Sequence, residues 1–473
     1  MKTIREWRDN MLRLYNTLTR TIEDFKPINP PNVGIYTCGP TVYREVHIGN
    51  FRTYLMADYL RRTLEYNGFE VTHIRNITDV GHMRRLDQEN REAIDPVIEE
   101  ALKVGKTPQD IAKHYTDLYL KDEEKLNIKK AAKYPKASEH VKEMIGIIKI
   151  LLKKGLAYET DGTVYFDVKK FKDYGKLSGN TLERMDKLLK AVRISVETDK
   201  KDSVDFALWK KAESDRLMKW DSPFGVGFPG WHIECSAMSI KYLGDTFDIH
   251  TGGEDLIFPH HEDEIAQSEG ASGQHFVNYW LHGGYLLVDS EKMSRSKGNV
   301  YTISDLENKG YEPLAFRYLT FMTHYRTKMN FTYHALHGAQ TALNRLRADV
   351  KNFDKPKIGC AEFEQRFLKA INNDLNMPEA LGIVWELVRS DYPSSAKAES
   401  LLKFDNVLGL DLFQSQVGSR KLQVPQNVME MVREREELRR QKRYHLADQL
   451  RNKIKKMGYN AIDKGKGTEI KKI

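Results

Sequence analysis

Residues 33–80 constrain the fold of this 473-residue chain more than any other segment. VGIYT is a short apolar run that predicts a strand, and the Gly39-Pro40 step predicts the turn that ends it. FRTYLMADYLRRTLEYNG then has apolar residues at near-helical spacing, and FEVTHIRNIT predicts a second strand. A strand, a glycine-bearing turn, a helix and a strand build a parallel sheet, whose ligands bind beside the helix N-terminus.

The rest of the sequence predicts further domains around this unit. Residues 96–211 are lysine-rich and mostly helical in pattern, interrupted by AYETDGTVYFDV, which predicts a hairpin on its Asp-Gly turn. FDIHTGG and GGYLLVD predict strands again, and beyond Tyr333 the pattern is helical almost to the end. The α/β fold that we predict has a Rossmann-like nucleotide-binding domain over 20–290 with an inserted connective domain at about 110–215, a region bearing a basic loop over 291–335, an all-α bundle over 336–413 and a small basic C-terminal domain over 414–473.

The net charge of +8 is concentrated at one end of the chain. Residues 420–473 contain 16 Lys and Arg against 7 Asp and Glu, so the other residues sum to about −1. A basic segment of this kind predicts contact with a polyanion, and a solvated tail would have the same composition. One basic end fits a monomer that binds one polyanion, so we expect a monomer, although a symmetric dimer would have the same composition.

The composition indicates a cytoplasmic protein. Hydrophobic residues make up 40% and charged residues 30% of the chain, which is typical of a soluble globular protein. The charged N-terminal segment predicts no signal peptide, and no apolar run reaches the length of a membrane span. Three widely spaced cysteines, Cys38, Cys235 and Cys360, do not predict a disulfide framework. The role of Cys360, structural or incidental, stays open.

Two motifs have the composition of a nucleotide phosphate site. His47-Ile48-Gly49-Asn50 begins the predicted helix, where backbone N–H groups and the helix dipole favour a phosphate. KMSRSKGN (292–299) combines cations, hydroxyls and a glycine, which suits the β- and γ-phosphates of a nucleotide. Alone, the first could be an ordinary helix start and the second an exposed basic turn. Their order and their separation by about 245 residues favour a joint site.

A short helix and two of the cysteines predict a metal site. His260 and Glu264 are four residues apart on a helix, so their side chains point the same way. With Cys38 and Cys235 they make a chemically reasonable zinc set. His261 competes for the same role, but one residue further on it turns about 100° away. Taken singly, a buried free cysteine or an acidic helix start needs no metal.

Together, HIGN and KMSRS resemble the two signature motifs of class I aminoacyl-tRNA synthetases. Within that class the chain resembles the cysteinyl-tRNA synthetase family over essentially its whole length. The resemblance is carried by YTCGPTVYREVHIGN, RNITD, PGWHIECSAMS, FDIHTGGEDLIFPHHEDEIAQS and KMSRSKGN, with NNDLNMPEAL and LADQLRNKIKKMGY downstream. It implies activation of L-cysteine with ATP to cysteinyl-adenylate, transfer of cysteine to the 3′ end of tRNA(Cys), tRNA-stem contacts for 291–335 and anticodon binding by 414–473.

The resemblance also implies roles for individual residues. The ligands of one Zn²⁺ per chain, which selects the cysteine thiolate, would be Cys38, Cys235, His260 and Glu264. The residues that bind the amino acid would be Cys38, Thr78 and Trp231. The residues that contact ATP, which enters with Mg²⁺, would be Gly39, His47, Gly49, Asn50, Gly253, Asp255, Lys292, Arg295 and Ser296. The catalytic residues would be His47, Asn50, Lys292, Ser294 and Arg295.

The physical argument for zinc is selectivity. Serine differs from cysteine by one atom, and a pocket that only fits a side chain separates near-isosteres by about 10–200-fold. A soft thiolate that bonds to zinc discriminates by chemistry that a hydroxyl cannot match.

The sequence departs from the family pattern at three places. Asn50 replaces the last histidine of the commoner HIGH form, so no proton-transfer role carries over to it. Arg295 replaces the second lysine of KMSKS and keeps its charge with a planar donor. After RNITD the chain has Val80-Gly81-His82-Met83 in place of a lysine-bearing stretch, so any role of those lysines is lost. We expect His82 to be a surface or packing histidine.

Three other functions would use parts of this pattern. An ATP-dependent cysteine ligase that acts on an amino sugar would keep the zinc and ATP motifs but would not need the basic C-terminal segment. A zinc hydrolase built on the His260-His261-Glu262 cluster would leave HIGN and KMSRS unexplained. A catalytically inactive relative that only binds RNA would have no reason to retain His47, Lys292 and the zinc set.

Overall fold

A computed structural model of the chain describes residues 11–80, 96–180, 184, 200–214, 216–294, 298–413, 426–441, 443–457, 459–464 and 467–472. The chain divides into two compact units, Met1–Leu412 and Phe413–Ile473. None of the helices in the described ranges is both long and apolar enough to cross a membrane.

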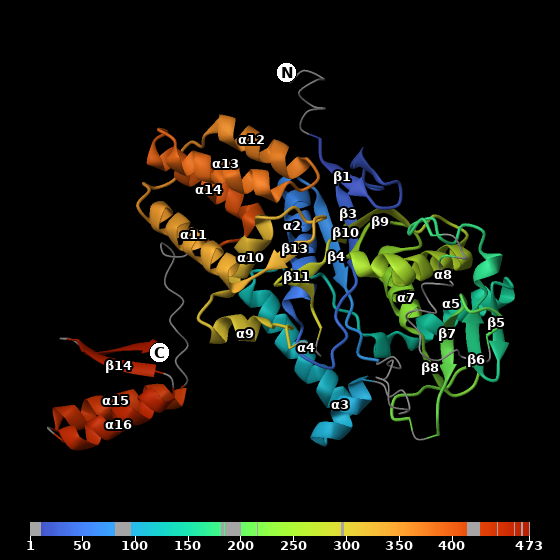
Figure 1. Ribbon diagram of the computed structural model, residues 1–473, viewed down its shortest axis with the longest axis horizontal. Coiled ribbons are helices and arrows are strands. Elements are labelled where there is room, and N and C mark those ends of the chain that lie inside the picture. The colour runs from blue at the N-terminus through green and yellow to red at the C-terminus, as the bar shows by residue number, and fades with distance from the viewer. Residues whose placement is uncertain are drawn as a thin grey trace. The chain divides into compact units, whose positions relative to one another are not determined.

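A four-stranded parallel sheet lies inside the first unit (Figure 1). Its order is β10-β9-β3-β4, and the strands are β3 (Asn32–Thr37), β4 (Glu70–Arg75), β9 (Phe247–Gly253) and β10 (Val277–Gly283). Helix α2 (Ile48–Tyr66) connects β3 to β4, and α8 (Glu262–Ser272) connects β9 to β10. These connections step outward from β3 and β9 in opposite directions. The C-terminal ends of β3 and β9 therefore form a switch point, where doubly wound sheets bind ligands.

The β3–α2–β4 unit confirms the sequence prediction for residues 33–80. Strand β3 buries Val33, Ile35 and Tyr36, because a central parallel strand is covered on both faces. Figure 1 places α2 on one side of the sheet and α7 (Trp231–Leu243) and α8 on the other. Helix α2 ends at Tyr66, where Asn67 caps it and Gly68 takes the positive φ of 87° that follows.

The residues between β4 and α7 form an insertion with its own antiparallel sheet of order β5-β6-β7-β8. Its elements are α3 (Pro96–Val104), α4 (Pro108–Lys125), η1 (Ala137–Glu139), α5 (Val141–Lys153), β5 (Ala157–Thr160), β6 (Thr163–Phe166), η2 (Val168–Lys170), β7 (Phe206–Lys211) and β8 (Gly227–Pro229). The predicted hairpin is β5–β6, with Asp161 and Gly162 at φ of 46° and 76°. Strands β7 and β8 extend it; the sequence pattern over 96–211 predicts helix at β7 and makes no prediction for β8. A short apolar run such as FALWKK is compatible with both the helical and the strand period, so its pattern does not distinguish them.

A three-stranded sheet of order β12-β11-β13 follows β10. Its strands are β11 (Leu286–Val288), β12 (Glu291–Lys292) and β13 (Met329–Phe331), with α9 (Ile303–Asn308) and α10 (Pro313–Phe321) between β12 and β13. The buried Arg52 of α2 joins this sheet to the central domain. Its Nη1 donates to the carbonyl oxygens of Gly284 (2.5 Å) and Tyr285 (2.6 Å), and its Nη2 donates to that of Thr327.

Four helices complete the first unit, together with a hairpin of β1 (Arg13–Asn16) and β2 (Thr21–Asp24). The helices are α11 (Tyr333–Lys351), α12 (Ala361–Asn372), α13 (Met377–Arg389) and α14 (Ser394–Leu408). The predicted helical run through NNDLNMPEAL is split between α12 and α13. Asn376 caps α13 there, because its Oδ1 accepts from the backbone N–H of Glu379.

The second unit contains the predicted basic helical pair and a hairpin. Its elements are α15 (Gln426–Arg440), α16 (Tyr444–Lys456), β14 (Tyr459–Lys464) and β15 (Gly467–Lys472). Val428, Val432, Ile454 and Ala461 form its core. The sequence pattern does not predict β14–β15, because these strands are short and rich in charge.

Candidate active site

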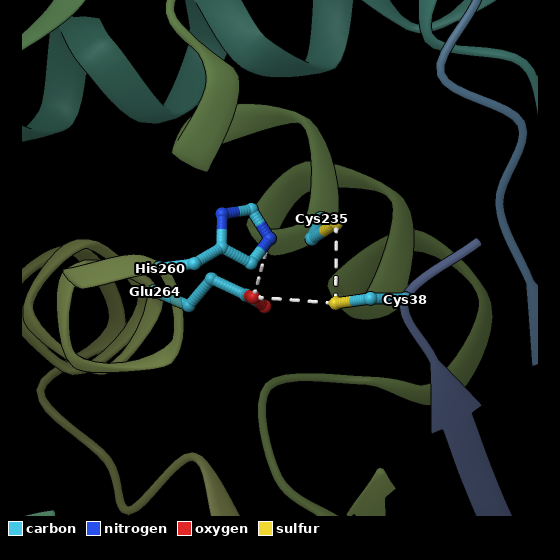
Figure 2. A group of neighbouring side chains, drawn as sticks. All are labelled: Cys38, Cys235, His260 and Glu264. Atoms are coloured by element: carbon cyan, nitrogen blue, oxygen red, sulfur yellow. Dashed lines mark hydrogen bonds and ion pairs between the residues drawn. The ribbon is translucent and has the colours of Figure 1, made fainter. Parts of the chain in front are cut away.

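Four side chains predicted as metal ligands converge beside the C-terminal end of β3 (Figure 2). Cys38 directly follows β3, Cys235 lies on α7, His260 on η4 (Ile257–His261) and Glu264 on α8. All four are buried, and their donor atoms lie within 4.8 Å of one another. Figure 2 shows the four side chains pointing toward one another from separate segments of the chain.

The spacing of these donors is compatible with a metal ion. The Sγ atom of Cys38 lies 3.8 Å from Sγ of Cys235 and 3.7 Å from Oε1 of Glu264, and Nε2 of His260 lies 3.1 Å from the same Oε1. Donors that share one zinc ion at about 2.0–2.3 Å lie within about 4.6 Å of one another. The donor set of two sulfurs, one nitrogen and one oxygen suits zinc.

The thiols of this cluster are protonated unless a cation offsets their burial. Burial, and then the neighbouring Cys235, raise the pKa of Cys38 well above its ordinary value. The hydrogen bond with Cys38 lowers the pKa of Cys235, but burial and the Glu264 and Glu234 carboxylates raise it more. A divalent cation in contact with a thiol reverses this balance and favours the thiolate.

A second histidine, His232, orients His260. The Nδ1 atoms of the two rings lie 2.9 Å apart, and Nε2 of His232 lies 3.2 Å from the Asp263 carboxylate. The indole of Trp231 stacks on the His260 ring with the centroids 4.3 Å apart. Contacts of this kind fix the ring and leave Nε2 for a metal, as is usual for metal-binding histidines.

A second donor set overlaps the first and includes a histidine that the sequence analysis missed. Cys38 and Glu264 also lie within 4.8 Å of His250 and His261. His250 is buried on β9, and its Nε2 lies 3.0 Å from Oε2 of Glu264. Its position near the C-terminal end of a predicted parallel strand is the only signal in FDIHTGG that could have indicated it.

His261 comes closer to the cluster than its helical rotation suggests. Its Nε2 lies 3.3 Å from Sγ of Cys38 and 3.9 Å from Oε1 of Glu264. Around a helix axis, Glu264 lies about 40° from His260 and about 60° from His261, so the two histidines flank the carboxylate. Burial, followed by the neighbouring His250, lowers the pKa of His261 well below its ordinary value, so its ring is neutral.

A cleft of about 350 Å³ opens beside Cys38 at the switch point of the sheet. Its wall includes the start of α2, the end of β9, the turn before β11 and strand β12. The predicted site residues that line it are Cys38, Gly39, His47, Gly49, Asn50, Trp231, Gly253, Asp255 and Lys292. The structure thus brings three residues of HIGN, the first two residues of KMSRS (Lys292 and Met293) and one cysteine of the donor set into a single cleft.

His47 is the N-cap of α2, and its hydrogen bond determines which ring nitrogen can donate. Nδ1 accepts from the backbone N–H of Asn50 at 3.3 Å. Burial lowers the pKa of His47, so the ring is neutral and carries its proton on Nε2. His47 is therefore a neutral hydrogen-bond donor. It is not a cation.

The remaining predicted residues have different surroundings. Thr78 is buried, donates to Oε2 of Glu234 (2.9 Å) and is not part of the cleft wall. The backbone N–H of Ser294 donates to Oδ1 of Asn299 (2.7 Å). Arg295, Ser296 and His82 lie outside the described residues.

Lys292 and Asp255 both line the cleft wall. Lys292 is exposed on β12, with its ammonium 5.2 Å from the ring centroid of Tyr285. Burial raises the pKa of Asp255, and the nearby Lys292 opposes this increase. An amine and a carboxyl therefore face the same space in the cleft.

Comparison with known proteins identifies the class first. A family profile described as the tRNA synthetases class I (C) catalytic domain matches residues 24–341. The fold resembles Mycobacterium tuberculosis methionyl-tRNA synthetase in complex with methionyl-adenylate (TM-score 0.52, 13% identity, 80% of this chain and 90% of that chain). It also resembles Agrobacterium radiobacter K84 agnB2 LeuRS in a ternary complex with tRNA and LeuAMS (TM-score 0.54, 12% identity, 82% of this chain and 84% of that chain). The chain is a class I tRNA synthetase in fold and in family.

The full-length relatives then identify the particular family. A cysteine–tRNA ligase of Caldicellulosiruptor saccharolyticus is 40% identical over 98% of this chain and all of its own length. Cysteine–tRNA ligase 1 of Burkholderia lata is 42% identical over 97% of this chain and 96% of its own length. The cysteine–tRNA ligase of Thermococcus onnurineus is 39% identical over 98% of this chain and 99% of its own length. The chain belongs to the cysteine–tRNA ligase family.

Proposed function

We propose that this enzyme activates L-cysteine with ATP and transfers cysteine to the 3′ end of tRNA(Cys), and that a zinc ion held by Cys38, Cys235, His260 and Glu264 selects the substrate thiolate. One observation carries the proposal: Cys38 belongs both to the four-donor cluster and to the wall of the cleft. A small amino acid in the cleft therefore lies beside the donor set.

The donor set with both cysteines is the better zinc site of the two. It offers two soft sulfur donors, whereas the set that contains His250 and His261 offers one. When bound there, zinc would supply a Lewis acid for the thiolate of the substrate cysteine. Trp231, which stacks on His260 and lines the cleft, covers the substrate on one side.

The other end of the cleft suits the phosphates of ATP, which enters with Mg²⁺. A carboxylate oxygen of cysteine attacks the α-phosphorus, the bond to the β-phosphate oxygen breaks, and pyrophosphate leaves with that electron pair. Nε2–H of His47, the amide of Asn50 and the ammonium of Lys292 donate hydrogen bonds to the phosphate oxygens as charge develops on them. Gly49 leaves room for the base, and Gly253 and Asp255 hold the ribose.

Transfer follows in the same cleft. The 3′-terminal hydroxyl of tRNA attacks the carbonyl carbon of cysteinyl-adenylate, and AMP leaves. We propose that the basic second unit binds the anticodon end of the tRNA and that Ser294, Arg295 and Ser296 contact pyrophosphate. Thr78 supports the amino-acid pocket through its hydrogen bond to Glu234, one residue before Cys235. A monomer in the cytoplasm remains our prediction.

The first experiment is amino-acid-dependent ATP–pyrophosphate exchange without tRNA, run with each of the twenty amino acids. We expect exchange with cysteine alone, lost when a chelator removes zinc and restored when zinc is returned. Exchange with serine at a comparable rate would contradict selection by a metal. No exchange with any amino acid, from folded enzyme that contains zinc, would contradict the proposed activity.

A further inference from the structure

Arg44 lines the cleft and has no role in the proposed reaction steps. It lies three residues before His47, between β3 and α2, and its guanidinium carbon is 4.7 Å from the ring centroid of Tyr43. Its Nη1 is buried and has no hydrogen-bond partner in the described part of the chain. A buried cationic N–H without an acceptor costs free energy, so a ligand that provides an acceptor would be favoured here.

The charges of the cleft leave Arg44 without a counter-ion. Arg44 and Lys292 are the only permanently cationic side chains among the described residues of its wall, which also contains two acids, Glu45 and Asp255. Burial raises the pKa of Asp255 and Lys292 opposes this increase, so these two groups are close enough to interact. Neither Glu45 nor any other carboxylate forms an ion pair with Arg44 in the ranges that the structure describes.

We propose that Arg44 is a phosphate-binding residue of this cleft. A guanidinium presents parallel N–H donors to two phosphate oxygens, and a phosphate would supply the acceptor that Nη1 lacks. His47, the nearest proposed phosphate contact in the sequence, is neutral, so Arg44 adds the charge that His47 does not. The inference rests on the proposed function, under which two ligands bring phosphates to the cleft. These are ATP, with its triphosphate, and tRNA, with its 3′-terminal phosphodiester.

Two assays of the full-length enzyme distinguish these sources. The first measures KM for ATP in tRNA-free pyrophosphate exchange. The second measures single-turnover transfer from preformed cysteinyl-adenylate at increasing tRNA concentration. The variants are Arg44→Gln and Arg44→Lys, and the matched control is Arg389→Gln, which removes an exposed arginine at the end of α13 that is not part of the cleft wall.

We expect Arg44→Gln to weaken one of these interactions by about 10- to 100-fold, because a charge-assisted hydrogen bond is lost. Arg44→Lys should lose less, because it keeps the charge, and Arg389→Gln should match the wild type. A higher KM for ATP identifies the triphosphate. A defect confined to transfer identifies the tRNA end, and the slope of log affinity against log salt should then fall by about one.

Two outcomes overturn the proposal. The first is wild-type behaviour of Arg44→Gln in both assays. The second is an equal loss of rate in Arg44→Gln and Arg44→Lys, together with a lower unfolding temperature and an unchanged affinity for both ATP and tRNA. That pattern is expected for a residue with only a structural role. Wild-type enzyme without cysteine-dependent exchange would instead contradict the proposed function, so the two failures are distinguishable.

Discussion

At the residue scale, the two sulfur atoms of the donor cluster are the most specific chemical feature of the site. We predict that Cys235→Ser loses most of its bound zinc, because a hydroxyl is a far poorer zinc ligand than a thiolate. KM for cysteine should rise by more than about tenfold, while KM for ATP should change little. Zinc content of the purified variant and the two KM values in pyrophosphate exchange measure these effects.

Cys360→Ser is the matched control for this substitution. Cys360 is as buried as Cys235, at 2% exposure each, but it lies at the start of α12 and is outside the donor cluster. Both variants replace a buried thiol with a hydroxyl, so a shared loss of stability is subtracted. Zinc content equal to that of the wild type in Cys235→Ser would exclude Cys235 as a ligand.

Lys292 should act on the rate of adenylate formation. Its side chain is exposed on β12 and lines the cleft, so it can neutralise charge that develops on the leaving pyrophosphate. We predict that Lys292→Ala lowers kcat of pyrophosphate exchange about 10²- to 10³-fold, with little change in thermal unfolding. Lys292→Arg should keep more activity. A fall in stability as large as the fall in kcat would indicate a structural role.

Sequence patterns predict the donor cluster well and the residues around it poorly. Cys38, Cys235, His260 and Glu264 come from different elements, and each lies in a recognisable motif. His250 is missed because a single histidine in an apolar strand has no spacing to compare, and only the register of β9 places it beside Glu264.

At the element scale, the close approach of two strand ends positions Cys38. The backbone N–H of Gly39 donates to Oδ1 of Asn76 at 2.7 Å, and a Cβ atom at Gly39 would lie 1.6 Å from the backbone oxygen of Asn76. We predict that Gly39→Ala moves Cys38, lowers zinc content and costs about 1–3 kcal/mol of stability. Denaturant unfolding and metal analysis measure both effects.

Gly146→Ala is the control for the added methyl group. Gly146 is exposed inside α5, and a Cβ there meets no atom within 4 Å. Alanine favours a helix interior, so this variant should be stabilised by about 0.5–1 kcal/mol. Normal zinc content and normal stability in Gly39→Ala would contradict the prediction. They would show that the ends of β3 and β4 can move apart at little cost in free energy.

The fold is predictable from sequence where an element has a clear period and clear ends. The β3–α2–β4 unit, the β5–β6 hairpin and the α15–α16 pair meet this condition, and all are present. Strands β7 and β8 do not meet it, because their pairing with the hairpin is a long-range contact that short apolar runs do not specify. Strands β14 and β15 are missed for another reason: they form a local hairpin, but their sequences are rich in charge and have no apolar alternation.

At the scale of the whole molecule, a buried ion network joins the sheet domain to the helices that follow it. Oδ2 of Asp58 on α2 accepts from Arg62 (2.7 Å) and from Arg317 on α10 (2.6 Å). Arg317 also donates to the carbonyl oxygens of Leu126 and Leu408. The Asp58 carboxylate thus joins α2 to α10, and its partner Arg317 joins α10 to the ends of α4 and α14.

We predict that Asp58→Asn costs about 3–5 kcal/mol, because it leaves two buried arginines without their charge partner. Burial raises the pKa of Asp58, but Arg317 and Arg62 lower it more, to well below its ordinary value. The contribution of Asp58 is therefore complete above its unfolded-state pKa of about 4 and is lost as the pH falls toward the folded-state value. Urea unfolding of wild type and variant at several pH values should show their difference shrinking below about pH 4.

The control for this network is an exposed ion pair, Arg366 with Glu386. Surface pairs contribute about 0–1 kcal/mol, so Glu386→Gln should change stability little at any pH. If Asp58→Asn were as mild as Glu386→Gln, the network would not be what joins these helices.

The division of the chain after Leu412 separates the cleft, where both steps of the proposed reaction occur, from the basic segment proposed to bind tRNA. The cleft wall and the donor cluster lie in Met1–Leu412, whereas the basic residues 420–473 lie in the second unit. We predict that a chain ending at Leu412 keeps cysteine-dependent pyrophosphate exchange. Its kcat/KM for tRNA cysteinylation should fall about 10²-fold or more, because contacts to the phosphate backbone are lost.

A charge variant tests whether the lost contacts are electrostatic. Lys453 and Lys455 are exposed on α16, so replacing both with Gln removes two charges and keeps the unit. The double variant should raise KM for tRNA, reduce its salt dependence and leave exchange unchanged. Cysteinylation of tRNA at full efficiency by the truncated chain would show that the second unit does not serve tRNA. It would also remove the argument that separates this enzyme from a cysteine ligase acting on an amino sugar.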